Sequence, residues 1–150
     1  MTKGDLFMEN DTTKLLRECD SGAKTAINSI NEMLNKVKNP SLLSVLTKSL
    51  LTHQDLQVKI GQALVEAGAD TKDPPVMAKI MSWAKINMKM MEHNEDKTIA
   101  ELVLDGCNMG IKQLCSYVNE YSEADEKSQS LAKKLIKEEE RLIDELKNYL

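Results

Sequence analysis

The residues of this 150-residue sequence best suited to chemistry are two cysteines, one histidine and one glutamate: Cys19, His53, Cys107 and Glu139. Each falls on the apolar face of a different predicted helix, so all four are expected to point into a helical core. If they converge, two thiols, an imidazole and a carboxylate suit Zn²⁺ better than a pair of iron ions, because a second metal would lack bridging carboxylates. These four residues are therefore the candidate metal ligands.

A structural interpretation of the same residues competes with metal binding. A cysteine on an apolar helical face is usually a small buried hydrophobe, and His53, Gln57 and Glu139 can satisfy one another as a polar layer. Folding the last two predicted helices together brings Cys107 level with Glu139. Folding the first two together brings Cys19 closer in level to Gln57 than to His53. We therefore predict a core polar layer without a cofactor, and keep zinc or iron at an altered central site as the alternative.

Charge and motif content exclude several classes of function. The net charge is −4 and no basic cluster lies beside aromatic residues, so nucleic acid is not an expected partner. The sequence has no Gly-rich phosphate loop, nucleophile elbow or CxxC pair, which favours a non-catalytic protein.

No apolar run approaches the roughly 20 residues that span a membrane, and the N-terminus does not read as a signal peptide. Cys107 and Cys115 lie about 12 Å apart along one predicted helix, too far for a disulfide, so we expect reduced thiols and a cytoplasmic location.

An internal repeat organises the chain. The segment Leu15–Glu32 returns in a weaker form as Val103–Glu120, which pairs Cys19 with Cys107 at an offset of 88 residues (107 − 19). Both copies carry apolar residues at helical spacing, so each predicts one amphipathic helix. A segment that recurs at this distance predicts a duplicated pair of helices.

The composition and the helix signals predict an all-α fold. Aromatic residues make up only 3% of the chain, and long runs of Leu, Lys, Glu and Met favour helices over strands. Asn39 and Pro40 end one helix and begin the next, Gly68 is a suitable C-terminal residue, and Ser122 with Asp125 resembles a capping box. The expected helices span 11–38, 40–67, 74–91, 97–121 and 123–148. We therefore predict a disordered lead-in over 1–10 and one domain over 11–150, made of a hairpin over 11–68, a crossover helix over 74–91 and a hairpin over 97–149.

The predicted crossover helix over 74–91 is rich in methionine. Met77, Met81, Met88 and Met91 lie near one face, where methionine more often fills gaps in a core than binds Cu(I). Together with Met90, the last two make this part of the helix apolar on more than one side. This pattern predicts a surface for a protein partner or for a homo-oligomer.

Three motifs carry a resemblance to a known class of proteins: LLRECDSG in the first helix, GADTKDPP after the second, and the segment from Trp83 through DGCNMGIKQL. Over residues 12–149 the chain resembles the ferritin-like four-helix bundles, and within them a rubrerythrin-related bacterial family of unknown function. The resemblance implies two pseudo-repeated antiparallel hairpins joined by a crossover helix.

The di-iron ligand set of the ferritin-like proteins is missing from this sequence. Such sites use a Glu from two helices and a Glu-x-x-His pair from the other two. Here Leu50 stands three residues before His53, and the last predicted helix contains no histidine. The predicted function is therefore a non-catalytic structural or protein-interaction role. A metal-binding or redox protein using Cys, His and Glu is the alternative, and a carrier of apolar ligands is a third option.

Overall fold

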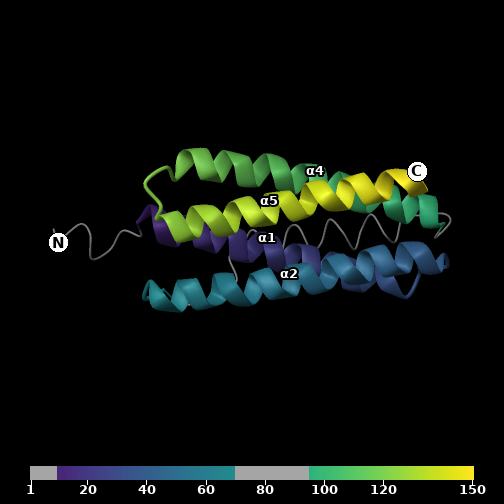
Figure 1. Cartoon of the computed structure of the whole chain (residues 1–150), viewed down its shortest axis with the longest axis horizontal. Helices are drawn as coiled ribbons and strands as arrows, with labels where there is room; N and C mark the ends of the chain where they lie inside the picture. The colour runs from purple at the N-terminus through teal and green to yellow at the C-terminus, as the bar shows by residue number, and fades with distance from the viewer. Residues whose placement is uncertain (1–9, 70–94) are drawn as a thin grey trace.

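The computed structural model describes residues 10–69 and 95–150, and all regular secondary structure in these ranges is helical (Figure 1). Four long helices and a final 3₁₀ turn follow in order: α1 (Asp11–Leu34), α2 (Pro40–Glu66), α4 (Asp96–Glu120), α5 (Glu126–Leu146) and η2 (Lys147–Tyr149). The predicted all-α four-helix architecture is confirmed. The predicted helix over 74–91, its methionine surface and the lead-in over residues 1–9 lie outside the described residues.

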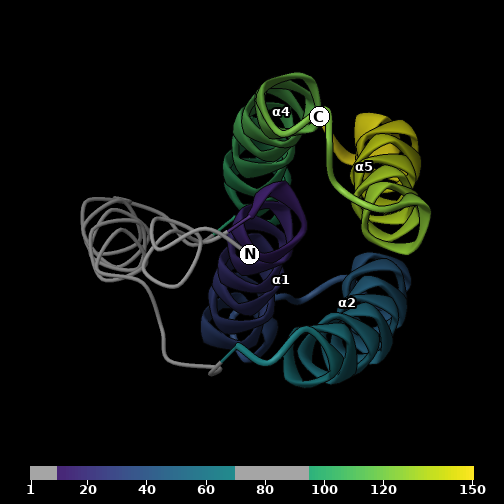
Figure 2. The same cartoon turned by 90° about the vertical axis from the view of Figure 1, so that its left-hand side faces the viewer.

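The four described helices pack as an antiparallel bundle. Viewed along the bundle axis, α1 packs against α2 and α4, and α5 packs against the same two helices (Figure 2). At one end, Asp11 and Thr12 accept hydrogen bonds from the backbone N–H groups of Glu123 and Asp125, at 3.0 and 2.8 Å. The start of α1 is thus joined to the connection between α4 and α5. Among the described helices none has the length and apolar character needed to cross a membrane.

Side-chain caps fix where most of the helices begin. The Asn10 side chain accepts a hydrogen bond from Thr13 N at 2.9 Å, and Asn39 does the same for Ser41 N at 2.8 Å with Pro40 at the first helical position. Helix α2 is followed by Gly68, whose φ of +77° is readily adopted only by glycine. The start and the end of α2 agree with the signals read from the sequence, and α1 begins at residue 11 as predicted.

The first helix ends earlier than predicted, at Leu34 instead of residue 38. The two oxygens of Asp96, at the start of α4, accept hydrogen bonds from the backbone N–H groups of Lys38 and Asn39, both at 2.9 Å. Because these N–H groups are bonded to a distant carboxylate, they cannot continue the helical ladder. The contact also places the start of α4 at the turn between α1 and α2.

The last long helix begins later than predicted, at Glu126 instead of residue 123. Its cap is Asp125, whose carboxylate accepts a hydrogen bond from Ser128 N at 2.8 Å. The predicted capping box starting at Ser122 is therefore wrong. The N–H groups of Glu123 and Asp125 are instead bonded to the start of α1, which holds residues 122–125 outside the helix.

The core consists of two apolar clusters with a polar layer between them. One cluster includes Leu16, Ile60 and Leu135, and the other includes Leu46, Ile99 and Leu142, all at most 1% exposed. Burying each such side chain stabilises the fold by roughly 1.5–3 kcal/mol. The helix faces that carry His53 and Glu139 are buried as predicted, and so are the apolar residues along them: Leu42, Leu46, Leu50, Ile60, Leu64, Leu131, Leu135, Leu142 and Leu146.

Candidate functional site

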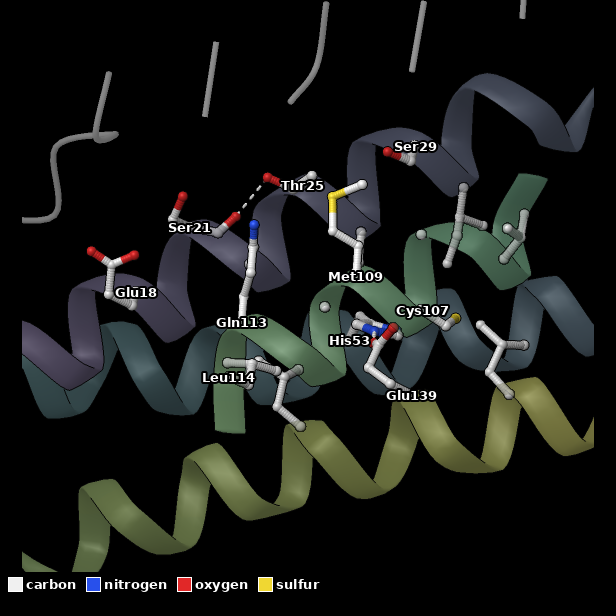
Figure 3. Close-up of a pocket in the computed structure, with 18 of the residues that line it drawn as sticks. Glu18, Ser21, Thr25, Ser29, His53, Cys107, Met109, Gln113, Leu114 and Glu139 are labelled. Carbon is white, nitrogen blue, oxygen red and sulfur yellow. Dashed lines mark hydrogen bonds and ion pairs between the residues drawn. The ribbon is translucent and has the colours of Figure 1, made fainter. Parts of the chain in front are cut away.

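His53 of α2 and Glu139 of α5 meet in the middle of the bundle. The His53 side chain is fully buried and Glu139 is only 7% exposed. The imidazole Nε2 of His53 is in hydrogen-bonding contact with the Glu139 carboxylate oxygen Oε1. Cys107 of α4 lies beside Glu139 (Figure 3). Three of the four candidate residues are therefore brought together, from three different helices.

The hydrogen bonds of His53 define its protonation. Its Nδ1 lies 2.8 Å from the backbone carbonyl oxygen of Ser49, one turn earlier. A carbonyl can only accept, so Nδ1 carries a proton and donates it. Burial alone would lower the pKa of His53, but the hydrogen bond and negative charge of Glu139, with Ser49 and Glu138, raise this pKa above its ordinary value. With Nε2 protonated as well as Nδ1, the pair would be an imidazolium and a carboxylate without net charge.

A second buried contact joins the same two helices one turn away. Ser49 Oγ donates to Glu138 Oε2 at 2.8 Å, and Arg141 donates to both oxygens of Glu138, from Nε at 2.8 Å and from one terminal nitrogen at 2.6 Å. Arg141 also pairs with Glu145 at 2.8 Å. The two buried carboxylates at positions 138 and 139 are thus both bonded to protein groups. Of these two carboxylates, helical periodicity predicted only Glu139 to point into the core.

Cys19 lies in the other apolar cluster, away from this polar layer. It is fully buried, and burial, followed by the charges of Glu18 and Asp20, raises the pKa of its thiol to about 12. Gln57 donates to Asp20 at 3.2 Å, so its polar contact is made near Cys19 and not with His53. The structure therefore does not bring all four candidate residues to one point.

The donor set fits neither a di-iron centre nor a preformed zinc site. Across residues 10–69 and 95–150, no group of three or more His, Cys, Asp and Glu side chains is placed to hold a metal ion. The His53 imidazole is bonded on both nitrogens, so neither nitrogen is free to bind a metal ion. Burial and the charge of Glu139 also raise the pKa of the Cys107 thiol, which disfavours the thiolate that zinc requires.

A cavity of about 120 Å³ extends from the polar layer to the seam between α1 and α4 (Figure 3). His53, Glu139 and Cys107 form its inner end, and Ser21, Thr25 and Ser29 line its α1 side. Thr25 Oγ1 donates to the carbonyl of Ser21 at 2.8 Å. This row of hydroxyls was not predicted from the sequence, although residues spaced four apart along a helix are expected to lie on one face.

Glycines explain why the cavity reaches Glu139. Gly22 of α1 and Gly106 and Gly110 of α4 all line it, and a Cβ added at Gly22 or Gly106 would have no atom within 4 Å. A Cβ added at Gly110 would lie 3.8 Å from Glu139 Oε2. The missing side chains leave open space beside the carboxylate.

Comparisons of the chain with protein-family models, with curated proteins and with solved structures gave no match.

The raised pKa of His53 predicts how stability depends on pH. In the unfolded chain the imidazole loses its proton near pH 6.5, whereas the folded protein retains it to higher pH. The stabilisation by this pair is therefore complete below about pH 6.5 and is lost as the pH rises through the folded pKa. We expect the melting temperature of the wild type to fall, relative to that of His53→Gln, between pH 6 and 9.

Thermal melts of the wild type and His53→Gln at half-unit pH steps measure this difference. Glu139→Gln, which changes the partner of His53, serves as the matched variant. For a chain of this size, each kcal/mol corresponds to about 2–4 °C. Parallel curves for the wild type and His53→Gln across this range would show that folding does not raise the pKa of His53.

Proposed function

We propose that this chain is a non-catalytic bundle of the ferritin-like class that acts by protein association, and that its partner is a second copy of itself. The observation that carries the proposal is an apolar stripe on the outer face of α2. Leu43, Leu51, Val58 and Val65 are all exposed there, Leu51 to 60% and Val65 to 66%. At 100° per residue they fall within about 80° of one another, along nearly the whole helix.

The ferritin-like part of the proposal is supported by the order of the helices. Lys127 at the start of α5 pairs with Glu66 at the end of α2, at 2.9 Å, whereas Asp96 at the start of α4 contacts the turn before α2. The end of α2 and the start of α4 thus lie at opposite ends of the bundle. A crossover over 74–91 between two pseudo-repeated hairpins would make this connection.

The absence of catalysis is supported by how the core polar groups are used. Glu138, Glu139 and His53 are bonded to protein groups, and the buried thiols of Cys19 and Cys107 have raised pKa values, which makes them poor nucleophiles. All three cysteines are free thiols, in keeping with a reducing, cytoplasmic location.

The spacing of the α2 stripe suits self-association. Leu51, Val58 and Val65 recur every seven residues, as in the seam of a coiled coil. In an antiparallel pair of α2 helices with the twofold axis near Gln54, Leu51 meets Val58 of the second copy. Leu43 then meets Val65 at each end. A twofold dimer requires such a self-complementary surface, and no helix within the described residues covers this face.

Charges placed in this stripe should separate association from folding. We expect the wild type to sediment as a dimer that dissociates on dilution, and Leu51→Lys/Val58→Lys to be monomeric. Because both side chains are more than half exposed, each change should cost less than about 0.5 kcal/mol of folding stability. Sedimentation velocity and thermal melting measure the two effects.

The matched control is Ser116→Lys/Ser130→Lys, which adds the same charge at exposed positions on α4 and α5 and should remain dimeric. A wild type that stays monomeric at several hundred micromolar would contradict the proposal. So would a Leu51→Lys/Val58→Lys protein with an unchanged mass.

Metal or redox chemistry at an altered central site is the second candidate, favoured by the contact of Cys107, His53 and Glu139. We expect protein purified without chelator or affinity tag to contain no stoichiometric metal. His53→Leu should then leave the metal content unchanged but destabilise the fold by about 3–5 kcal/mol, because it leaves a buried carboxylate without its partner. Elemental analysis and denaturant unfolding measure these two quantities. Stoichiometric zinc or iron that is lost in His53→Leu would establish the metal site instead.

A further inference from the structure

We propose that the cavity between α1 and α4 is a binding site for a small uncharged molecule with a short apolar body and one hydroxyl-type head, and that the head donates a hydrogen bond to Glu139. A short primary alcohol represents this class. The site is separate from the α2 stripe, so the proposal does not depend on self-association.

The volume of the cavity sets the size of the ligand. An apolar cavity of about 150 Å³ in a protein core can hold benzene. The cavity here is about 120 Å³, which leaves room for roughly six non-hydrogen atoms. Leu102, Val103, Met109 and Leu114 of α4 line it beside Ile30 and Met33 of α1. These side chains provide the apolar surface that a short hydrocarbon body would cover.

The polar end of the cavity supplies one available acceptor. Glu139 Oε1 is bonded to His53, while Oε2 faces the space that Gly110 leaves by having no side chain. A carboxylate oxygen accepts more than one hydrogen bond. A hydroxyl beside Gly110 would therefore donate to Oε2 without displacing His53 from Oε1.

The charges of the lining select an uncharged ligand. The cavity is lined by Glu18 and Glu139 but by no lysine or arginine, so an anionic head would have no counter-charge. Beside Glu139, where the head lies, a protonated His53 balances the carboxylate, so a cationic head there would bury an additional positive charge. Glu18 lies farther along the cavity, away from Glu139 (Figure 3). An alcohol avoids both costs because it brings a donor and no charge.

Three probes of equal chain length test this selection: 1-pentanol, pentanoate and pentylammonium. Protein labelled with ¹³C at the methionine methyl groups reports binding, because Met33 and Met109 line the cavity. We expect saturable shifts of these two methyl signals with 1-pentanol, and at least tenfold weaker binding of both charged probes. Absence of saturable shifts with any probe would overturn the site, and tighter binding of either charged probe would overturn the ligand class.

Two glycine substitutions locate the head of the ligand. A Cβ at Gly110 lies 3.8 Å from Glu139 Oε2, and a Cβ at Gly61 lies 3.8 Å from Gln57 Nε2, but only Gly110 lines the cavity. Both Gly→Ala changes lie within helices and introduce no close contact, so both proteins should fold. We expect Gly110→Ala to weaken 1-pentanol binding about tenfold, the effect of losing roughly one hydrogen bond. Gly61→Ala should leave binding unchanged, and equal effects of the two changes would overturn the assignment of the head to Glu139.

Discussion

The rest of the structure depends on a buried polar contact between α2 and α5. His53 and Glu139 occupy the middle of the core, between its two apolar clusters, and Ser49 with Glu138 repeats the polar contact one turn away. Breaking a buried pair leaves a charge without a partner, at a cost of about 3–5 kcal/mol. A shift of α2 relative to α5 would break these bonds, so we expect the polar layer to favour one register. The two apolar clusters pack on either side of it.

The two sides of the bundle differ because of this layer. The α2–α5 seam is closed by charged and hydroxyl groups that bond to one another, whereas the α1–α4 seam contains glycine, alanine, serine and threonine. Small side chains on both facing helices leave the space that becomes the cavity, with the ionic pair at its inner end. Helix α2 has a second, independent feature on its outer face. There Leu51, Val58 and Val65 are each more than half exposed, and they form the surface for which self-association is proposed.

The features that follow from local patterns could be predicted from the sequence. The helical periodicity of apolar residues predicted that His53 and Glu139 lie on buried helix faces. The pair Asn39-Pro40 predicted the turn between α1 and α2. Helical phase gives the direction of a side chain but not its height along the bundle. Folding each predicted hairpin at its turn supplied the height: it placed Cys107 level with Glu139 and Cys19 nearer Gln57, as the structure has them. The end of α1 depends on Asp96, a residue far away in the sequence. The burial of Glu138 likewise depends on Ser49 of another helix.

The protonation state of the His53 ring tests the account most directly. Nitrogen chemical shifts of ¹⁵N-labelled histidine distinguish protonated from unprotonated ring nitrogens, and assignment by comparison with His53→Gln identifies this residue. At pH 7.5, where an unperturbed imidazole with a pKa of about 6.5 is mostly neutral, the account predicts protons on both Nδ1 and Nε2 of His53. An unprotonated Nδ1, or a neutral ring at this pH, would contradict a bundle centred on an imidazolium–carboxylate pair.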